Sequence, residues 1–234
     1  MSIIYSRKYF FNEKFFLKWS SEMAYVLGYW FADGYMTSDK SYRVAFFSVD
    51  KEHLQNISIT LAYEAPVRRF NRNGKPGSIY NLTFRSKNFF NSLKLLGGMS
   101  RKSFTMEFPK IPGIFLADFI RGYFDGDGSV HLVRYTRTKD RKRQIDLRSS
   151  FTSGSNKFLF KLRDVLTKFP GLTPKKVYSY ANKKYPKNNH WKLSYGTKDT
   201  LKLLKFMYYG GCPLYLDRKY AIYQKYLKNL ISHE

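Results

Sequence analysis

Polar and apolar positions follow the same order of periods in the two halves of the chain. Helical spacing with start and stop signals predicts one helix from Ser20-Ser21-Glu22 to Gly34 and another from Pro112-Gly113 to Gly128. Alternating segments predict strands at residues 43–49, 67–70, 80–85, 147–153, 177–180 and 191–195. Further helices are predicted between and after these strands, at residues 51–62, 87–96, 155–168 and 198–208. The pattern therefore predicts the order α-β-β-α-β-β-α in each half.

A sequence repeat supports this interpretation. VLGYWFADGYM (residues 26–36) and IRGYFDGDGSV (residues 120–130) align without a gap at an offset of 94. Asp33 aligns with Asp127, and the glycines that follow them align as well. We predict an α+β fold of two pseudo-symmetric repeats, residues 1–105 and 114–234, joined by a proline-containing linker at residues 106–113. Because each motif helix needs a partner, the two repeats are expected to pack through these helices into one body.

Each motif helix carries small residues at a spacing of four. They are Ala24, Gly28 and Ala32 in the first helix, and Gly122 and Gly126 in the second. Residues four apart share a helix face, so each helix has a stripe without side-chain bulk that lets two backbones approach closely. A single stripe of this kind arises readily by chance, but two aligned copies argue against chance. Packing the stripes together would place Asp33 beside Asp127.

Two carboxylates at neighbouring helix C-termini are unfavourable without a counter-charge. Like charges raise a carboxyl pKa, and the helix ends add partial negative charge. A divalent cation relieves both effects, and oxygen ligands without nearby Cys or His favour Mg²⁺ over zinc. An EF-hand loop starting at Asp125 is excluded, because its sixth position would be Val130 and its twelfth Thr136.

The charge balance indicates a polyanionic partner. The chain has 42 Lys and Arg against 17 Asp and Glu, a formal net charge of +25 and a pI near 10.0. Nucleic acid is the most common such partner, although ribosomal and membrane-surface proteins share this balance. We expect no membrane span and no signal peptide. With one cysteine and four scattered histidines, the chain is expected to form neither an internal disulfide nor a zinc site. We therefore expect an intracellular setting.

The doubled motif with its terminal Asp-Gly, in αββαββα halves, resembles the LAGLIDADG homing endonucleases of the single-chain, two-repeat type. The resemblance covers residues from about 20 to 230. The first copy departs from the consensus at Phe31, where the second has Asp125, but the acid before the closing glycine is present in both. The resemblance implies a monomer that cleaves double-stranded DNA at a long, asymmetric target and leaves short 3′ overhangs. Its two antiparallel sheets would form a saddle in the major groove.

The resemblance also implies a set of site residues. Asp33 and Asp127, with Ala32 and Gly126 beside them, would hold Mg²⁺; Mn²⁺ would substitute, and Ca²⁺ would support binding without cleavage. Lys102 and Lys219, which follow paired glycines, match the family's basic residue near each cut. Any one of so many basic residues is equally explained by contact with phosphate or solvent. Ser48 and Ser153 match a polar, water-ordering position at the end of the second strand.

Direct readout of bases requires side chains that reach the major groove, notably Arg to guanine and Asn or Gln to adenine. The candidates in the first repeat, apart from Ser48, are Arg43, Arg68, Arg69, Asn71, Arg72, Lys75 and Arg85. Those in the second repeat, apart from Ser153, are Arg134, Arg137, Arg141, Arg143, Gln144, Arg148, Tyr180, Asn182, Lys183 and Lys184. Many of these are expected to touch phosphate alone, since alternate residues of a strand face opposite ways.

Two other functions remain open from the sequence. Proteins with this motif also act as maturases that bind intron RNA, and some bind DNA without cleaving it. Retention of both Asp33 and Asp127 favours the nuclease, because a protein that only binds has no use for paired carboxylates.

Overall fold

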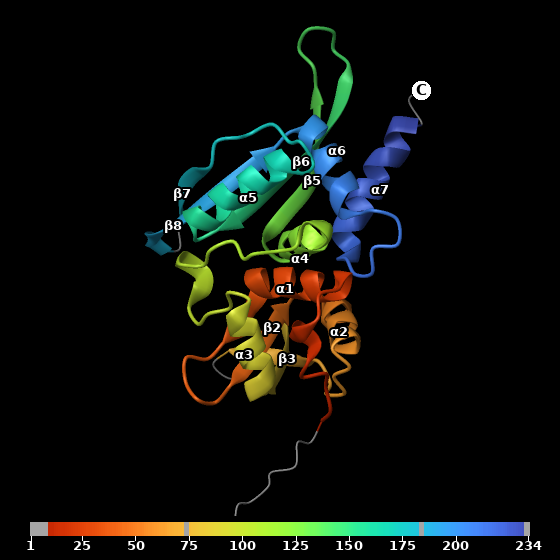
Figure 1. Cartoon of the computed structure of the whole chain (residues 1–234). Coiled ribbons are helices and arrows are strands. Elements are labelled where there is room, and N and C mark those ends of the chain that lie inside the picture. Colours follow the sequence, from red (N-terminus) through yellow and green to blue (C-terminus); the bar gives the residue numbers. More distant parts are fainter. Residues whose placement is uncertain (1–8, 73–74, 183–184, 232–234) are drawn as a thin grey trace, which may run out of the picture.

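The computed structural model describes residues 9–72, 75–182 and 185–231. Two halves with the same element order lie on either side of a central helix pair, α1 (Ser21–Asp33) and α4 (Leu116–Asp127) (Figure 1). The first half adds η1 (Phe15–Leu17), β1 (Gly34–Met36), β2 (Arg43–Ser48), α2 (Lys51–Thr60), β3 (Arg68–Arg72), β4 (Lys75–Arg85), α3 (Lys87–Leu95) and η2 (Lys102–Phe104). The second adds η3 (Gly113–Phe115), β5 (Gly128–Thr136), β6 (Arg143–Ser153), α5 (Asn156–Lys168), β7 (Tyr178–Asn182), β8 (Tyr185–Tyr195), α6 (Thr197–Met207) and α7 (Asp217–Ile231).

Each half contains one four-stranded antiparallel sheet. The strand orders are β1-β2-β4-β3 and β5-β6-β8-β7, so the two sheets have the same topology. Helices α2 and α5 pack on equivalent strands of the two sheets. The predicted α+β fold of two αββαββα repeats is confirmed.

Serine side chains fix where several helices begin. The Ser20 hydroxyl accepts a hydrogen bond from the Met23 amide at the start of α1. Ser86 does the same for the Phe89 amide of α3, and Ser155 for the Phe158 amide of α5. These caps satisfy amides that have no partner within the helix. They place the starts of α1, α3 and α5 within one or two residues of the predicted positions.

The central helices pack backbone to backbone through their glycines. A β-carbon on Gly28 would lie 2.0 Å from the carbonyl oxygen of Phe119, and one on Gly122 would lie 2.0 Å from that of Tyr25. Phe119 and Tyr25 are themselves equivalent positions of the repeat, so the contact is symmetric. The stripe of small residues is therefore the surface that joins the two halves.

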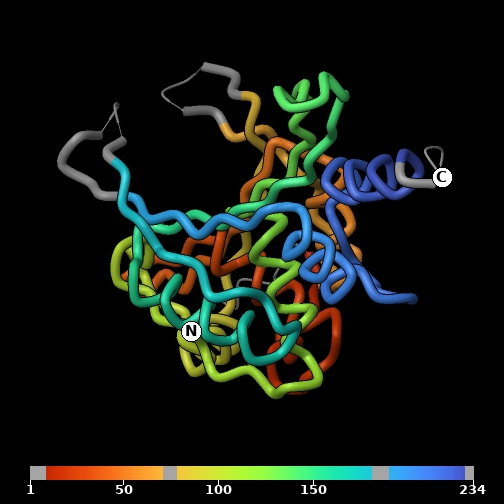
Figure 2. The backbone as a smooth tube through the Cα atoms, turned by 90° about the horizontal axis from the view of Figure 1, so that it is seen from above, coloured from red at the N-terminus to blue at the C-terminus, as the bar shows by residue number. Residues whose placement is uncertain are grey.

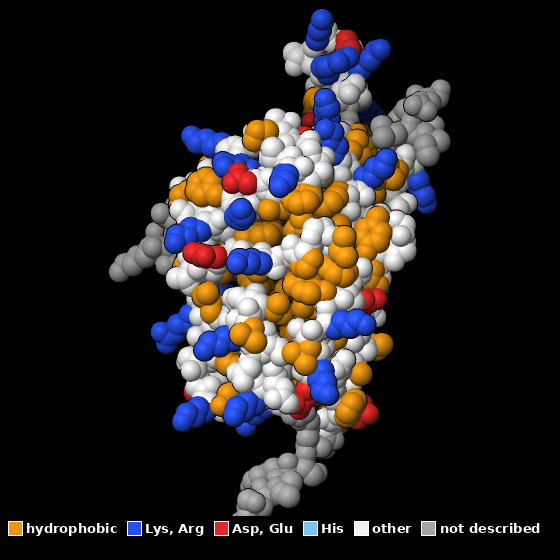
Figure 3. Space-filling model, in the orientation of Figure 1, with side chains coloured by type: hydrophobic (Ala, Val, Ile, Leu, Met, Phe, Trp, Pro, Cys, Tyr) orange, Lys and Arg blue, Asp and Glu red, His pale blue; other side chains and the backbone are white. Residues whose placement is uncertain are grey.

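One face of each sheet packs on helices and the other is open. In β2, Val44 and Phe46 are buried in the core, whereas Arg43 is exposed on the opposite face. The β5–β6 hairpin extends beyond the helices of its half, with α7 packed beside β5 (Figures 1 and 2). Lys and Arg side chains are spread over the face shown in Figure 3, where acidic side chains are few. Among the described residues, no helix combines the length and apolar character that crossing a bilayer requires.

The strands differ from the sequence prediction at their ends. Strands β1 and β5 begin at the glycines that close the motif helices, and the alternating segments did not identify them. Strands β4, β6 and β8 begin earlier than predicted because they continue into hairpins beyond the core. Residues there lack one buried face, so alternation of polar and apolar side chains is lost.

Candidate active site

The motif helices bring Asp33 and Asp127 together at their C-terminal ends. A β-carbon on Gly126 would lie 2.3 Å from the Ala32 β-carbon and 3.0 Å from Asp33 Oδ2. Burial raises the pKa of the Asp33 carboxyl. Burial and the neighbouring Asp33 charge together raise the pKa of Asp127 to about 7, against the opposing effect of Lys102. Two partly buried carboxylates that disfavour each other's ionisation form a site in which a cation would be stabilised.

The donor set fits a hard divalent cation. Within the described parts of the chain, no group of three or more His, Cys, Asp or Glu side chains lies together. The site therefore offers two carboxylates as metal ligands. The Ala32 carbonyl oxygen lies beside them and accepts a hydrogen bond from Lys102 Nζ. Mg²⁺ is commonly held by one or two carboxylates, with the remaining positions taken by water and substrate phosphate. Zinc, which prefers a full set of nitrogen or sulfur ligands, fits this site poorly.

Lys102 and Lys219 both lie buried beside the aspartates. Lys102 Nζ donates to Ala32 O at 3.1 Å and lies 5.3 Å from the Trp30 ring centre. Lys219 Nζ donates to Phe124 O at 2.5 Å, Asp125 O at 2.8 Å and Gly128 O at 2.6 Å. Burial lowers the pKa of each ammonium group to about 8, while the nearby aspartates oppose this shift.

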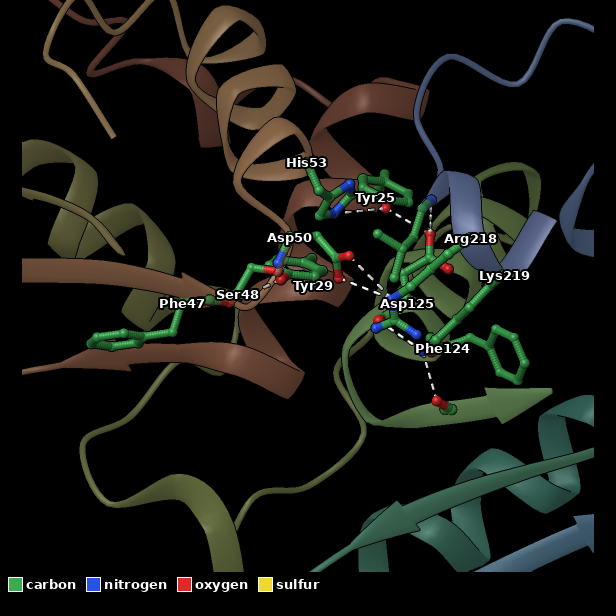
Figure 4. A network of polar contacts seen from close by, with 12 residues as sticks. Tyr25, Tyr29, Phe47, Ser48, Asp50, His53, Phe124, Asp125, Arg218 and Lys219 are labelled. Carbon is green, nitrogen blue, oxygen red and sulfur yellow. Dashed lines mark hydrogen bonds and ion pairs between the residues drawn. The ribbon is translucent and has the colours of Figure 1, made fainter. Parts of the chain in front are cut away.

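Asp125 belongs to a buried polar network that joins the halves (Figure 4). Its Oδ2 accepts from Tyr25 Oη at 2.7 Å and from the Leu216 amide at 2.8 Å. Tyr25 also contacts His53 Nε2 at 3.2 Å, so the network reaches α2. Burial raises the pKa of Asp125 to about 6 and lowers that of His53 to about 4. Asp125 thus ties the end of α4 to α1 and to the backbone just before α7.

A second link between the halves lies at the surface of the same region. The Arg218 guanidinium binds the Asp50 carboxylate, with Nε 3.0 Å from Oδ2 and 3.2 Å from Oδ1 (Figure 4). Arg218 lies at the start of α7, directly before Lys219. The start of α7 is thus held against α2 of the first half.

Ser48 and Ser153 are buried at equivalent strand ends. Ser48 Oγ accepts from the Asp50 amide at 3.0 Å, and Ser153 Oγ from the Ser155 amide at 3.1 Å. Each serine lies on the core face of its sheet, and Ser153 also lines a small pocket beside Asp127. The two hydroxyls fix the turns into α2 and α5.

Two tyrosines of the repeat were not assigned a role from the sequence. Tyr29 Oη donates to Phe47 O at 2.9 Å, and Tyr123 Oη donates to Thr152 O at 2.8 Å. Thr152 Oγ1 in turn donates to Asp127 O at 3.0 Å. The aligned tyrosines were visible in the repeat, and they fasten each motif helix to the second strand of its sheet.

A small pocket opens beside Asp127. Its volume is about 170 Å³, and Lys102, Thr152 and His190 line it together with Asp127. His190 lies on β8, and only strand pairing brings it to this position. No feature of the local sequence indicated this placement.

Comparisons with known proteins agree with this geometry. Residues 115–206 match the family model of the LAGLIDADG-like domain. Among solved structures, LAGLIDADG meganuclease I-AabMI bound to uncleaved DNA is similar, with 11% identity, 89% of this chain and 91% of that chain covered, and a TM-score of 0.58. The I-LtrWI LAGLIDADG homing endonuclease bound to target DNA shares 12% identity over 95% of this chain and 92% of its own, with a TM-score of 0.54. Residues 115–206 thus match a LAGLIDADG-like domain, and the chain as a whole has the fold of these structures.

A third similar structure is meganuclease I-SmaMI bound to uncleaveable DNA with a TTGT central four. It shares 13% identity over 90% of this chain and 88% of its own, with a TM-score of 0.53. No curated protein sequence matches the chain.

The register of the first sheet separates the predicted DNA contacts by face. Arg43 pairs with Arg85, and Arg68 pairs with Asn81, on the open face. Arg69 instead pairs with Tyr80 on the helix-covered face, and its guanidinium lies 5.8 Å from the centre of the Tyr80 ring.

The second sheet divides its candidates in the same way. Gln144 and Arg148 lie on the open face, with Tyr180 on the same face of β7. Arg134 and Arg143 lie on the opposite face, where they line a pocket with Tyr226 of α7. Strand alternation thus turns these two arginines toward α7, and their contact with DNA stays a prediction.

The remaining candidates lie at hairpin ends. Arg137 is ion-paired with Asp140, and Arg141 has a positive φ of 59° in the same turn. The side chains of Asn71, Arg72, Lys75 and Asn182, and the whole of Lys183 and Lys184, lie outside the described part of the structure.

Proposed function

We propose that this protein is a site-specific endonuclease that binds a long, asymmetric DNA duplex and hydrolyses one phosphodiester in each strand. The observation that carries this proposal is the pairing of Asp33 and Asp127 at the ends of two packed helices. The pair lies between two sheets whose open faces carry basic side chains. A protein that only binds nucleic acid gains nothing from two carboxylates that destabilise each other.

The chain's own groups have separate tasks in this mechanism. Asp33 and Asp127 would hold the divalent cation, which when bound would supply Lewis-acid stabilisation of charge on the phosphate. Lys102 places a positive charge beside Asp127, and its pKa of about 8 suits proton exchange near neutral pH. Lys219 neutralises the C-terminal end of α4.

The two halves of the protein correspond to the two halves of the DNA target. Each half of the protein would contact one half-site, and each aspartate one scissile phosphate, so a single chain suffices. We expect Mg²⁺ to support cleavage with short 3′ overhangs, Mn²⁺ to replace it, and Ca²⁺ to support binding without cleavage.

A cleavage selection tests the proposal. The protein is incubated with a randomised duplex library in Mg²⁺, and cut ends are captured and sequenced. We expect one asymmetric target to be enriched, with the two strands cut a few base pairs apart.

Three outcomes are separable. An enriched cut target supports the endonuclease. A library bound specifically but left uncut identifies a cleavage-inactive DNA-binding protein of the same fold. Absence of duplex binding, with tight binding to a structured intron RNA, identifies a maturase.

A further inference from the structure

The open face of the first sheet carries an apolar cluster. Phe47 on β2 and Phe70 on β3 have ring centres 5.2 Å apart and nearly perpendicular planes. Ala45 and Thr83 pair across β2 and β4 on the same face. Phe70 is 37% exposed and Tyr35 42% exposed. These side chains leave an apolar surface where a nucleic-acid interface would ordinarily be polar.

Arginines border this cluster. Arg43 and Arg85 pair at one end, and Arg68 lies on β3. Tyr35, Arg43, Arg68, Phe47 and Phe70 line a common pocket of about 640 Å³. The phenylalanines form the apolar base of this pocket, and the arginines form its positively charged edge. Such a surface is complementary to a DNA groove in which phosphates lie at the edges and an apolar group lies at the centre.

The second sheet is polar at the positions equivalent to Phe47 and Ala45, although Tyr180 is the counterpart of Phe70. Because Ser48 and Ser153 are equivalent, Phe47 corresponds to Thr152 and Ala45 to Ser150. Thr152 pairs with Lys192, and Ser150 pairs with Ser194. The two open faces therefore differ in chemistry although the folds match.

The cluster also lies close to the catalytic centre. Gly34, directly after Asp33, pairs with Phe46. The Phe47 carbonyl accepts the hydrogen bond from Tyr29 of α1. The cluster therefore lies on the strand that packs beside the Asp33 end of α1.

We propose that the first repeat recognises thymine methyl groups in its half-site, packed against Phe47 and Phe70, whereas the second repeat recognises its half-site by hydrogen bonds. The thymine C5-methyl is the apolar group that a base edge presents in the major groove. Arg43, Arg68 and Arg85 would contact the flanking phosphates. This inference rests on the proposed DNA-binding function.

Removing the thymine methyl groups from the DNA tests this inference with the unaltered protein. The selected target is prepared with thymine replaced by uracil in one half-site at a time, and the dissociation constant is measured in Ca²⁺. We expect one half-site alone to be sensitive, with affinity falling about fourfold for each fully buried methyl, the value for one CH₂ group. The other half-site is expected to bind equally well with thymine or uracil.

Protein variants assign the effect to the cluster. Phe47→Thr, which copies the second repeat, combined with Phe70→Ser should remove the discrimination between thymine and uracil. Tyr180→Ser, a change at a 40% exposed aromatic on the second sheet, is the matched control and should leave that discrimination intact. Thermal unfolding of each variant checks that it is folded.

The outcomes separate this inference from the proposed function. Equal binding of thymine and uracil in both half-sites, or sensitivity that survives the double variant, would overturn the inference while DNA binding stands. A protein that selects no duplex would overturn the proposed function itself.

Discussion

Lys102 and Lys219 occupy equivalent places beside the two aspartates but use their ammonium groups differently. Lys219 donates to three carbonyl oxygens at the end of α4. Lys102 donates to one carbonyl of α1 and lines the pocket beside Asp127. At the residue scale, the first arrangement stabilises a helix end and the second leaves a cation in the pocket beside Asp127.

Replacing each lysine by methionine separates these roles. Lys219→Met leaves buried carbonyls without a donor, so the free energy of unfolding should fall by about 3 kcal/mol. Lys102→Met should cost about 1 kcal/mol of stability and lower the cleavage rate by about 10²-fold. Urea denaturation and single-turnover cleavage provide the two readouts. Equal losses of stability in the two variants would contradict this assignment of different roles to the two lysines.

His53 makes folding stability depend on pH. Its folded pKa of about 4 lies below the unfolded value of 6.5, because burial disfavours the charged ring. The unfolded chain therefore binds more protons between these values, and stability is lost as pH falls from about 6.5 toward 4. The full effect is about 3 kcal/mol, from 1.36 kcal/mol per pKa unit.

The variant His53→Gln isolates this contribution. The free energy of unfolding of the wild type minus that of the variant should rise by about 3 kcal/mol as the pH increases from about 4 to 6.5, since the other titrating groups are common to both proteins and cancel in this difference. Denaturation at a series of pH values gives the difference. Parallel curves for the two proteins would show that His53 is not the titrating group.

At the scale of elements, the contact between α1 and α4 holds the molecule together. The β-carbon of Gly28→Ala or Gly122→Ala would overlap a backbone carbonyl of the facing helix, so the helices must separate. We expect each substitution to lower the free energy of unfolding by about 3 kcal/mol or more. Chemical denaturation measures the loss.

Gly196→Ala is the matched control for this prediction. Nothing lies within 4 Å of a β-carbon at Gly196, and its φ of −83° is ordinary for alanine. Its effect should stay within about 0.5 kcal/mol. If Gly28→Ala were as mild as this control, close backbone packing would not be what joins the halves.

The repeat explains which elements were predictable from the sequence. Two aligned motifs identified α1 and α4, and the small residues identified the face through which they pack. The prediction missed β1 and β5, because a strand that starts at the closing glycine of a helix has no separate start signal. It also missed His190 and the network of Asp125, Tyr25 and His53, since these contacts join residues far apart in the chain.

Strand register determines which of the predicted DNA contacts share a face of the sheet. A basic stretch indicates that arginines are near DNA, but the face of each residue depends on the pairing of β5 with β6. Gln144 and Arg148 fall on the open face and Arg134 and Arg143 on the other. A shift of one residue in register would exchange the two sets.

At the scale of the whole molecule, the net charge of +25 predicts strong dependence on salt. Each neutralised phosphate releases counterions, so about 6–10 phosphate contacts would lower DNA affinity about 10³–10⁵-fold between 50 and 200 mM salt. Titration of the selected duplex at several salt concentrations gives the slope. A flat dependence would exclude a large phosphate interface.

The central claim is that Asp33 and Asp127 form one catalytic site between the two halves. The most direct measurement compares wild type, Asp33→Asn and Asp127→Asn on the selected duplex in Mg²⁺, with binding and cleavage of each strand followed separately. Both variants should bind with nearly wild-type affinity and make no double-strand break. A variant that still breaks both strands at the wild-type rate would contradict the claim.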